Sequence, residues 1–376
     1  IVKHAYRVVA LQFPDDMLAD AQCVSDTIAS GVNAQSPDTP KESGDACRVF
    51  VLGDTTYGSC CVDTVAAEHV KASLIVHYGE SCQSLVTKVP VLYIYGRAEF
   101  ATNMDETVKS LRENITEGSR VVVLYECKWQ WRMQGLCKAL AEFAHVTMSV
   151  LRSEATGEED NATTVLGRLI PCEKSDEPHH EANRGTLDEA SSSEETTDDN
   201  EGGLYNFSDT TVVWVGPQGR TLTALMLNMP SAHRFVSYNP QTHDCLLEGA
   251  TVNKSLMRRY FLVEKCKQAQ TVGILVGTLG IAHHNELLAH IKTILKAAGK
   301  KFYTIVIGKI NGPKVANFLE VDAYVLVACA ENSLVDSKEF SVPIVTPFEM
   351  ELACTRGREW PGRLRTDLEE VLPQLS

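Results

Sequence analysis

The sequence lacks the features of three broad classes of protein. No stretch approaches the roughly 20 consecutive apolar residues of a membrane helix, and residues 1–4 do not begin a secretory signal. Basic surface for nucleic acid is also scarce, because 35 lysines and arginines face 49 acidic residues and the formal net charge is −14. We therefore expect no membrane and no nucleic acid among the partners, and a cytoplasmic location.

Short catalytic and metal-binding motifs are missing as well, although cysteine is abundant. The twelve cysteines form no Cys-x-x-Cys pair, and the chain has no P-loop, no His-Glu-x-x-His segment and no Ser–His–Asp spacing. Disulfides are not expected, because an apolar fraction of 44% can form a core and no export signal is visible. The thiols are therefore predicted to be reduced.

The chain repeats one structural pattern three times. A continuous apolar run, a turn and a helix-like stretch begin near residues 7, 120 and 271, and further short apolar runs follow each of them. Such runs between helices are typical of parallel strands buried on both faces. We predict an α/β protein of three domains with four strands each, at residues 1–117, 118–268 and 269–376. One large doubly wound sheet would give the same pattern.

The predicted strands and helices follow from this periodicity. The strands are expected at residues 7–13, 49–53, 74–78 and 91–95, then at 120–125, 146–150, 212–215 and 235–238, and finally at 271–277, 303–307, 323–328 and 344–346. Helices are expected at 15–29, 62–70, 129–143 and 282–298.

One segment departs from the pattern. Residues 153–209 include acidic stretches at 158–160 and 194–199, and their central part has too few apolar residues for a core. We expect a mobile acidic insertion within the second domain. His179 and His180 lie inside it, and we interpret them as a solvated pair rather than a metal site.

Cysteines follow three of the predicted strands. The segment GDTTYGSCCVD at residues 53–63 contains Cys60 and Cys61, HYGESC at 77–82 ends in Cys82, and Cys329 ends a strand of the last domain. Ligands bind at the carboxyl ends of parallel strands, and thiolates bind zinc and iron–sulfur clusters. If the domains face one another, these thiolates would converge on one metal centre. The alternative is that they are small buried residues.

These motifs resemble the diphthamide biosynthesis family. The segments at 53–63 and 77–82 resemble the first domain of that family. The third domain is resembled by VGILVGTLGIAHH at 272–284, by GKINGPKVANF at 308–318, and by Cys329 and Pro347-Phe348-Glu349. The resemblance covers nearly the whole chain apart from the acidic insertion. It implies three Rossmann-like domains, each a four-stranded parallel sheet with flanking helices, arranged around a central iron–sulfur site.

The resemblance also implies an activity. Catalytic members of the family use a [4Fe–4S] cluster to cleave S-adenosylmethionine reductively and transfer its 3-amino-3-carboxypropyl group to a histidine of elongation factor 2. In eukaryotes the enzyme is a heterodimer of diphthamide biosynthesis protein 1 and a second, related subunit, and it needs an electron-donating protein. These molecules are the expected substrates and partners.

The family pattern assigns ligands residue by residue. It places the first-domain ligand at Cys60, with Cys61 as an alternate, and the third-domain ligand at Cys329. The middle-domain ligand of catalytic members falls on Arg168 in this sequence, within VLGRLIPC at 165–172. We rank Cys82 as the remaining ligand, ahead of Cys172.

The missing middle ligand implies a supporting role. We expect a cluster-binding subunit that stabilises the catalytic partner or reduces its [4Fe–4S] cluster. Two alternatives stay open, namely a purely structural subunit without a cluster and a zinc-stabilised binding module.

Overall fold

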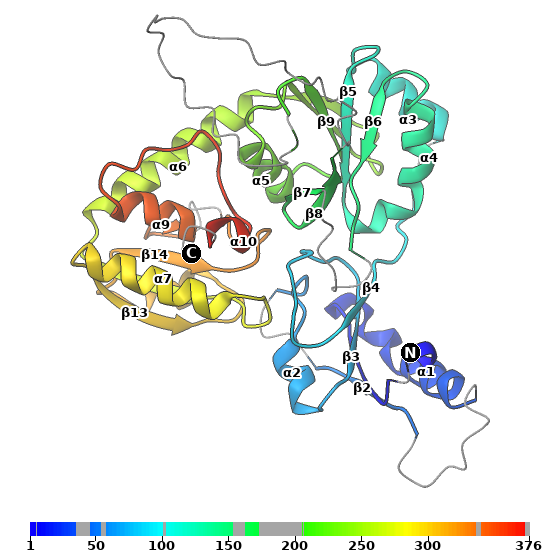
Figure 1. The fold of residues 1–376 in the computed structure, drawn as a ribbon, viewed down its shortest axis with the longest axis horizontal. Coiled ribbons are helices and arrows are strands. Elements are labelled where there is room, and N and C mark those ends of the chain that lie inside the picture. The colour runs from blue at the N-terminus through cyan, green and yellow to red at the C-terminus, as the bar shows by residue number, and fades with distance from the viewer. Residues whose placement is uncertain are drawn as a thin grey trace, which may run out of the picture.

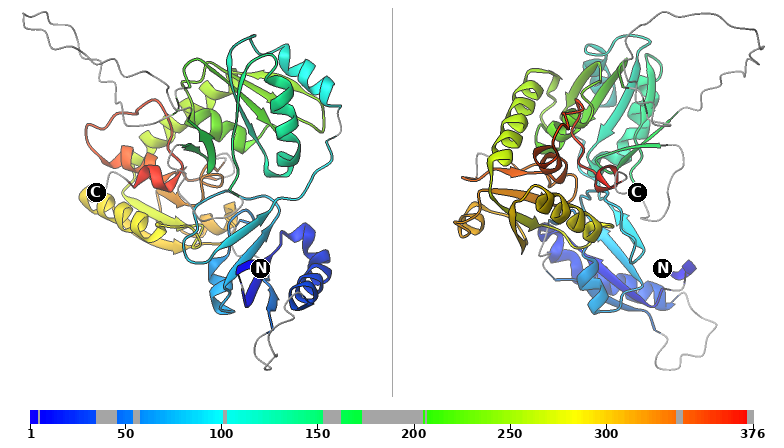
Figure 2. Two further views of the ribbon diagram at one scale, coloured as in Figure 1. Left: turned by 45° about the vertical axis from the view of Figure 1, so that its right-hand side comes forward. Right: turned by 60° about the vertical axis from the view of Figure 1, so that its left-hand side comes forward.

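Three β-sheets lie in three separate parts of the molecule in this computed structural model (Figure 1). The first sheet contains the N-terminal strands, the second lies beside α3–α6, and the third lies beside α7–α9. The turned views keep the three parts apart (Figure 2). The structure describes residues 1–4, 6–34, 46–53, 58–100, 103–152, 162–172, 205, 207–335 and 340–372.

The first sheet has four parallel strands in the order β2-β1-β3-β4, as predicted. The predicted helix at 15–29 begins as a 3-10 helix at Asp15–Asp20 and continues as α1. The elements of this part are β1 (Val8–Gln12), α1 (Ala21–Ala34), β2 (Arg48–Val51), α2 (Thr64–His69), β3 (Leu74–Tyr78) and β4 (Val91–Ile94), with a further 3-10 helix at Val2–His4. Helix α3 (Met104–Arg112) follows them in the chain and lies beside the second sheet (Figure 1).

The second sheet has five strands in the order β11-β10-β9-β5-β6, so the prediction of four parallel strands is wrong here. The extra strand, β11, runs antiparallel to β10 and pairs Cys245 with Tyr238. An antiparallel edge strand can follow its neighbour after a short connection, without the long crossover that a parallel strand needs. The apolar pattern of the sequence did not indicate such a strand here. The elements are β5 (Arg120–Tyr125), a 3-10 helix (Cys127–Trp129), α4 (Gln130–Leu140), β6 (His145–Met148), β9 (Thr210–Val215), α5 (Arg220–Asn228), β10 (Arg234–Tyr238), β11 (Cys245–Glu248) and α6 (Ala250–Gln268).

The third sheet again has four parallel strands, in the order β13-β12-β14-β15. Helix α9 starts with a capping box, in which Thr346 and Glu349 satisfy each other's backbone N–H groups. The elements are β12 (Thr271–Val276), α7 (His284–Ala297), β13 (Lys301–Val306), α8 (Gly312–Ala316), β14 (Ala323–Val327), β15 (Ile344–Val345), α9 (Pro347–Cys354) and α10 (Leu368–Val371).

The parallel strands of all three sheets follow one order. In each, the second strand lies on one side of the first, and the third and fourth lie on the other side. In sheets of this kind ligands bind at the carboxyl ends of the strands, near the point where the strand order reverses. The division into three related modules stays a prediction. The domain boundaries at 117/118 and 268/269 stay a prediction.

A β-hairpin lies where the sequence predicted part of an acidic insertion. Strands β7 (Ala162–Val165) and β8 (Arg168–Pro171) pair antiparallel, and Val150 forms a bridge with Leu169. The two turn residues, Leu166 and Gly167, have φ of 49° and 71°, as a tight two-residue hairpin turn requires. The apolar residues of this short stretch are buried, which explains why the prediction fails there. The structure does not describe residues 153–161, 173–204 and 206 of the predicted insertion, and these include His179 and His180.

The apolar core joins the sheets to one another. One cluster of buried side chains contains Trp214 of the second sheet and Ile274 of the third, together with Cys61, Cys82 and Cys329. Cysteines from different parts of the chain thus share one water-poor environment. Among the described helices, none has the length and apolar character needed to cross a lipid bilayer.

Candidate metal centre

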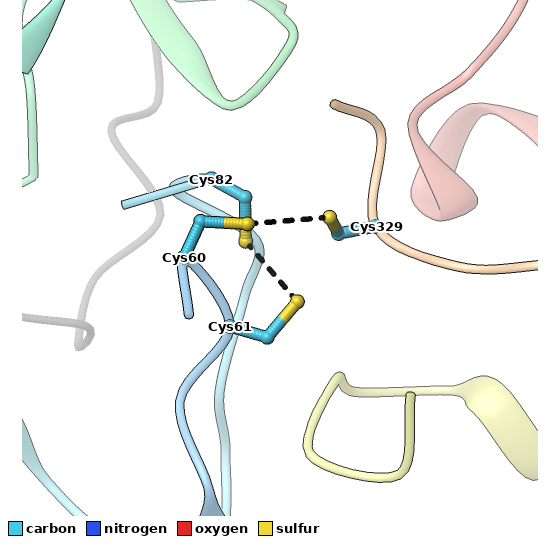
Figure 3. A group of neighbouring side chains, drawn as sticks. All are labelled: Cys60, Cys61, Cys82 and Cys329. Carbon is cyan, nitrogen blue, oxygen red and sulfur yellow. Dashed lines mark hydrogen bonds between the residues drawn. The ribbon is translucent and has the colours of Figure 1, made fainter. Parts of the chain in front are cut away.

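Four cysteines form a compact group at the carboxyl ends of the strands. Cys60 and Cys61 lie in the turn between β2 and α2, Cys82 follows β3, and Cys329 follows β14. Their sulfur atoms all lie within 4.8 Å of one another. Figure 3 shows Cys329 approaching the other three from a separate segment of the chain, 269 residues away from Cys60 in sequence.

Backbone hydrogen bonds hold the cysteine segments of the first sheet together. The amide of Cys82 donates to the carbonyl of Cys60 at 3.1 Å. Gln12, the last residue of β1, braces the same turn, because its Nε2 donates to the Cys61 carbonyl at 2.8 Å and its Oε1 accepts from the Asp63 amide at 2.9 Å. Gln12 is buried, so these bonds are not in competition with water.

Asn332 connects the third sheet to this group through its side chain. Its Nδ2 donates to Cys60 Sγ at 3.1 Å and to Cys329 Sγ at 3.3 Å. A Cβ at Gly58 would lie 2.7 Å from this Nδ2, so the glycine makes room for the amide. The sequence patterns did not indicate Asn332 as a site residue. Its position three residues after Cys329, in a turn at a strand end, was the available signal.

Three of the buried thiols influence one another's pKa through hydrogen bonds. Hydrogen bonds from Cys329, Cys60 and Cys61 lower the pKa of Cys82, whereas Cys329 has a raised pKa, chiefly because of its hydrogen bond with Cys60. For Cys61 the hydrogen bond with Cys329 acts to lower the pKa, but the hydrogen bonds with Cys60 and Cys82 and burial together raise it. Burial and these hydrogen bonds thus shift the pKa values of the three thiols in different directions, and a bound cation would favour the thiolate form of its ligands.

The donor set fits a thiophilic metal. Buried cysteine sulfurs are ligands for zinc and for iron–sulfur clusters. A tetrahedral zinc site with Zn–S bonds of about 2.3 Å places its sulfurs about 3.8 Å apart. The Cys60–Cys329 and Cys61–Cys82 pairs are each separated by 3.9 Å.

The structure brings together most of the cysteines predicted as ligands. Cys60, Cys82, Cys329 and the alternate Cys61 all belong to the group. The other alternate, Cys172, lies outside it, at the end of β8, with its Sγ 3.5 Å from Thr163 Oγ1. In the described structure all twelve cysteines are free, as predicted.

Comparison with known proteins gives the family of this chain. A family model described as "Putative diphthamide synthesis protein" matches residues 13–365. This chain is a member of the diphthamide synthesis family. It is 39% identical to a Danio rerio protein named 2-(3-amino-3-carboxypropyl)histidine synthase subunit 2. The 375 aligned residues cover 99% of this chain and 69% of that protein.

Other relatives of the family carry the same name. The protein from Gallus gallus is 40% identical over 369 residues, which cover 98% of this chain and 69% of that protein. The protein from Schizosaccharomyces pombe is 33% identical over 373 residues, which cover 98% of this chain and 65% of that protein.

A solved structure shares the fold of this family member. The structure of Dph2 from Pyrococcus horikoshii with a 4Fe-4S cluster superposes with a TM-score of 0.62 at 16% identity, covering 95% of this chain and 89% of that one. Another structure of the same protein gives a TM-score of 0.61 at 17% identity, covering 96% of this chain and 89% of that one. At this identity the likeness concerns the fold.

Proposed function

We propose that this chain is the supporting, cluster-binding subunit of a two-subunit enzyme in diphthamide biosynthesis. The enzyme transfers the 3-amino-3-carboxypropyl group of S-adenosylmethionine to a histidine of elongation factor 2. The partner subunit, diphthamide biosynthesis protein 1, carries the catalytic cluster, and this chain stabilises it or supplies its electron. The relatives' shared name, a synthase subunit 2, supports a role beside a partner.

The convergence of four buried sulfurs carries the proposal. Cys60, Cys82 and Cys329 are the proposed ligands, and Cys61 is a fourth sulfur within reach. A [4Fe–4S] cluster bound there would supply one-electron transfer. The turn between β2 and α2 and the segments after β3 and β14 hold the sulfurs, and the surrounding apolar residues keep water away from them.

The residues around the sulfurs have positioning roles in this proposal. Asn332 donates its amide N–H groups to two sulfurs, which favours their ionised form and fixes their separation. Gln12 holds the turn that carries Cys60 and Cys61 against the end of β1.

Zinc binding is a second candidate function, favoured by one observation. The sulfur separations of 3.9 Å are close to those of a tetrahedral zinc site. In that case the chain would be a zinc-stabilised binding module, without redox activity.

Anaerobic purification of the chain, alone and with its partner subunit, tests these proposals. We expect a brown protein with about four irons and matching sulfide. Cys329→Ala should lose this iron and its visible absorption. Substituting Cys60, Cys61 and Cys82 one at a time then identifies which sulfurs are ligands.

Cys172→Ala is the matched control, since this cysteine lies outside the group, and it should retain the iron of the wild type. Stoichiometric zinc without a visible chromophore would replace the cluster by the zinc-stabilised module. A colourless wild type free of both metals would leave a purely structural subunit.

A further inference from the structure

Arg168 is a fully buried cation beside the cysteine group. Its side chain is 2% exposed, and burying an unpaired charge is costly. Each of the three guanidinium nitrogens donates a hydrogen bond, one to Glu331 Oε1 at 3.1 Å and the others to the carbonyls of Tyr125 and Leu166 at 3.2 Å each. It also lies 5.4 Å from the centre of the Trp214 ring.

The hairpin that carries Arg168 packs directly on a cysteine segment. A Cβ at Gly167 would lie 2.7 Å from the carbonyl oxygen of Cys82 and 2.6 Å from Gln83 Cβ, so the hairpin turn touches the backbone beside this sulfur. Arg168 is the next residue along the chain. Arg168 thus follows a turn that rests on the Cys82 segment, and its guanidinium meets Glu331, two residues after Cys329.

Glu331 supplies the opposite charge, 3.1 Å from Arg168 and in the segment that follows Cys329. It lies two residues after Cys329, in the same turn as Asn332, whose amide reaches two of the sulfurs. Its side chain is 19% exposed. The ion pair therefore joins the hairpin that packs on the Cys82 backbone to the turn that follows Cys329.

We propose that the Arg168–Glu331 ion pair is a positioning pair that sets the electrostatic potential at the four-cysteine site, and hence the reduction potential of a cluster held there. This inference rests on the proposed cluster-binding function. Charges in a water-poor interior act over several ångströms with little screening. The paired charges cancel in the native protein, so removing one of them leaves the other uncompensated beside the sulfurs.

Each single substitution has an expected direction. Reduction adds one negative charge to the cluster, so an uncompensated cation favours it and an uncompensated anion opposes it. Glu331→Gln leaves Arg168 positive, because an arginine does not deprotonate in proteins. Its equilibrium constant for reduction should rise about tenfold, which corresponds to about 59 mV for one electron. Arg168→Met should lower the constant by a similar factor, and the double variant should lie between the two.

Spectroelectrochemical titration of the purified, cluster-loaded protein measures these shifts, with iron content recorded for every variant. The matched control is Glu349→Gln, since Glu349 pairs with the buried Arg259 in a similar ion pair between α6 and α9. It should leave the potential unchanged. A purely mechanical role for Arg168 would reduce the iron content of both single variants without moving their potentials in opposite directions.

Three outcomes overturn the inference: an unchanged potential in Glu331→Gln, shifts of the same sign in both single variants, or an equal shift in Glu349→Gln. If Glu331→Gln does not fold, the inference is tested on Arg168→Met instead. A reduction potential of Arg168→Met equal to or above that of the wild type then overturns it. A wild type that binds no iron defeats the proposed function instead, before any potential is measured.

Discussion

At the scale of single residues, the neighbours of the sulfurs matter as much as the sulfurs. Asn332 donates to Cys60 and Cys329, and Gln12 fixes the turn that carries Cys60. Hydrogen bonds to sulfur ligands tune a metal centre, because they stabilise negative charge on the sulfur. Such residues have no motif of their own in the sequence.

The amide of Asn332 gives a prediction of this kind. Asn332→Leu keeps similar bulk but removes both hydrogen bonds to the sulfurs. The reduced cluster carries more negative charge and loses more stabilisation than the oxidised one, so the reduction potential should fall by about 59 mV for a tenfold effect. Spectroelectrochemical titration measures the change.

Asn228→Leu serves as the control for this substitution. Asn228 is buried in α5 and donates to the carbonyl of Ala224 at 2.8 Å, so its loss should lower stability without moving the potential. A potential in Asn332→Leu equal to that of the wild type would show that the amide does not act on the cluster.

At the scale of secondary-structure elements, the β7–β8 hairpin packs against the backbone of Cys82. Leu166 is completely buried in a left-handed backbone conformation, which a bulky residue rarely adopts. Its amide donates to Asp367 Oδ2 at 2.9 Å, so the C-terminal segment also holds the turn. The residues packed around the hairpin turn thus hold it in this conformation.

The glycine of this turn allows a direct comparison of strain with packing. Gly167 and Gly118 share a φ of 71°, but a Cβ would meet the Cys82 backbone only at Gly167, and open space at Gly118. Gly118→Ala should lower the free energy of unfolding by about 1–2 kcal/mol through backbone strain alone. Gly167→Ala should cost about 1–3 kcal/mol more, because the contact must open.

Chemical denaturation of both variants measures the two costs, and iron content shows whether the opened contact disturbs Cys82. Equal costs for the two glycines would mean that the hairpin does not press on the cysteine segment.

At the scale of the whole molecule, the site joins the first and third sheets. These parts already touch without a metal, since the Ala282 amide donates to the Leu85 carbonyl at 2.9 Å and Gly280 packs against the backbone carbonyl of Val62. A bound metal would add a further connection through Cys329. The fold should therefore survive metal removal with lower stability.

Metal removal tests this connection. A ligand that binds only the folded state stabilises it by about 4 kcal/mol when present at 1,000 times its Kd. Chelation should therefore lower the Tm of the wild type, while the circular dichroism of the native fold is retained at low temperature. The Cys329→Ala variant should show the low Tm with or without chelator. A wild-type Tm that is the same in both conditions would mean that no metal connects the two parts.

Much of the fold could be predicted because it depends on local patterns. Continuous apolar runs such as β5 and β9 are buried on both faces, so they identified the parallel strands directly. Strand β11 was missed because two of its four residues, Leu246 and Leu247, are exposed at the sheet edge and give no alternating pattern. The hairpin was missed because its few apolar residues adjoin a long acidic segment.

The sequence by itself determined which chemistry is available. The cysteines at strand ends and the family motifs were visible there, because strand periodicity and residue type are local properties. Only the tertiary structure decided which thiols meet. It brought Cys61 into the group with Cys60, left Cys172 outside, and placed Asn332 and the Arg168–Glu331 pair around the sulfurs. These contacts join residues that are far apart in the chain, and they depend on how separate sheets pack against one another.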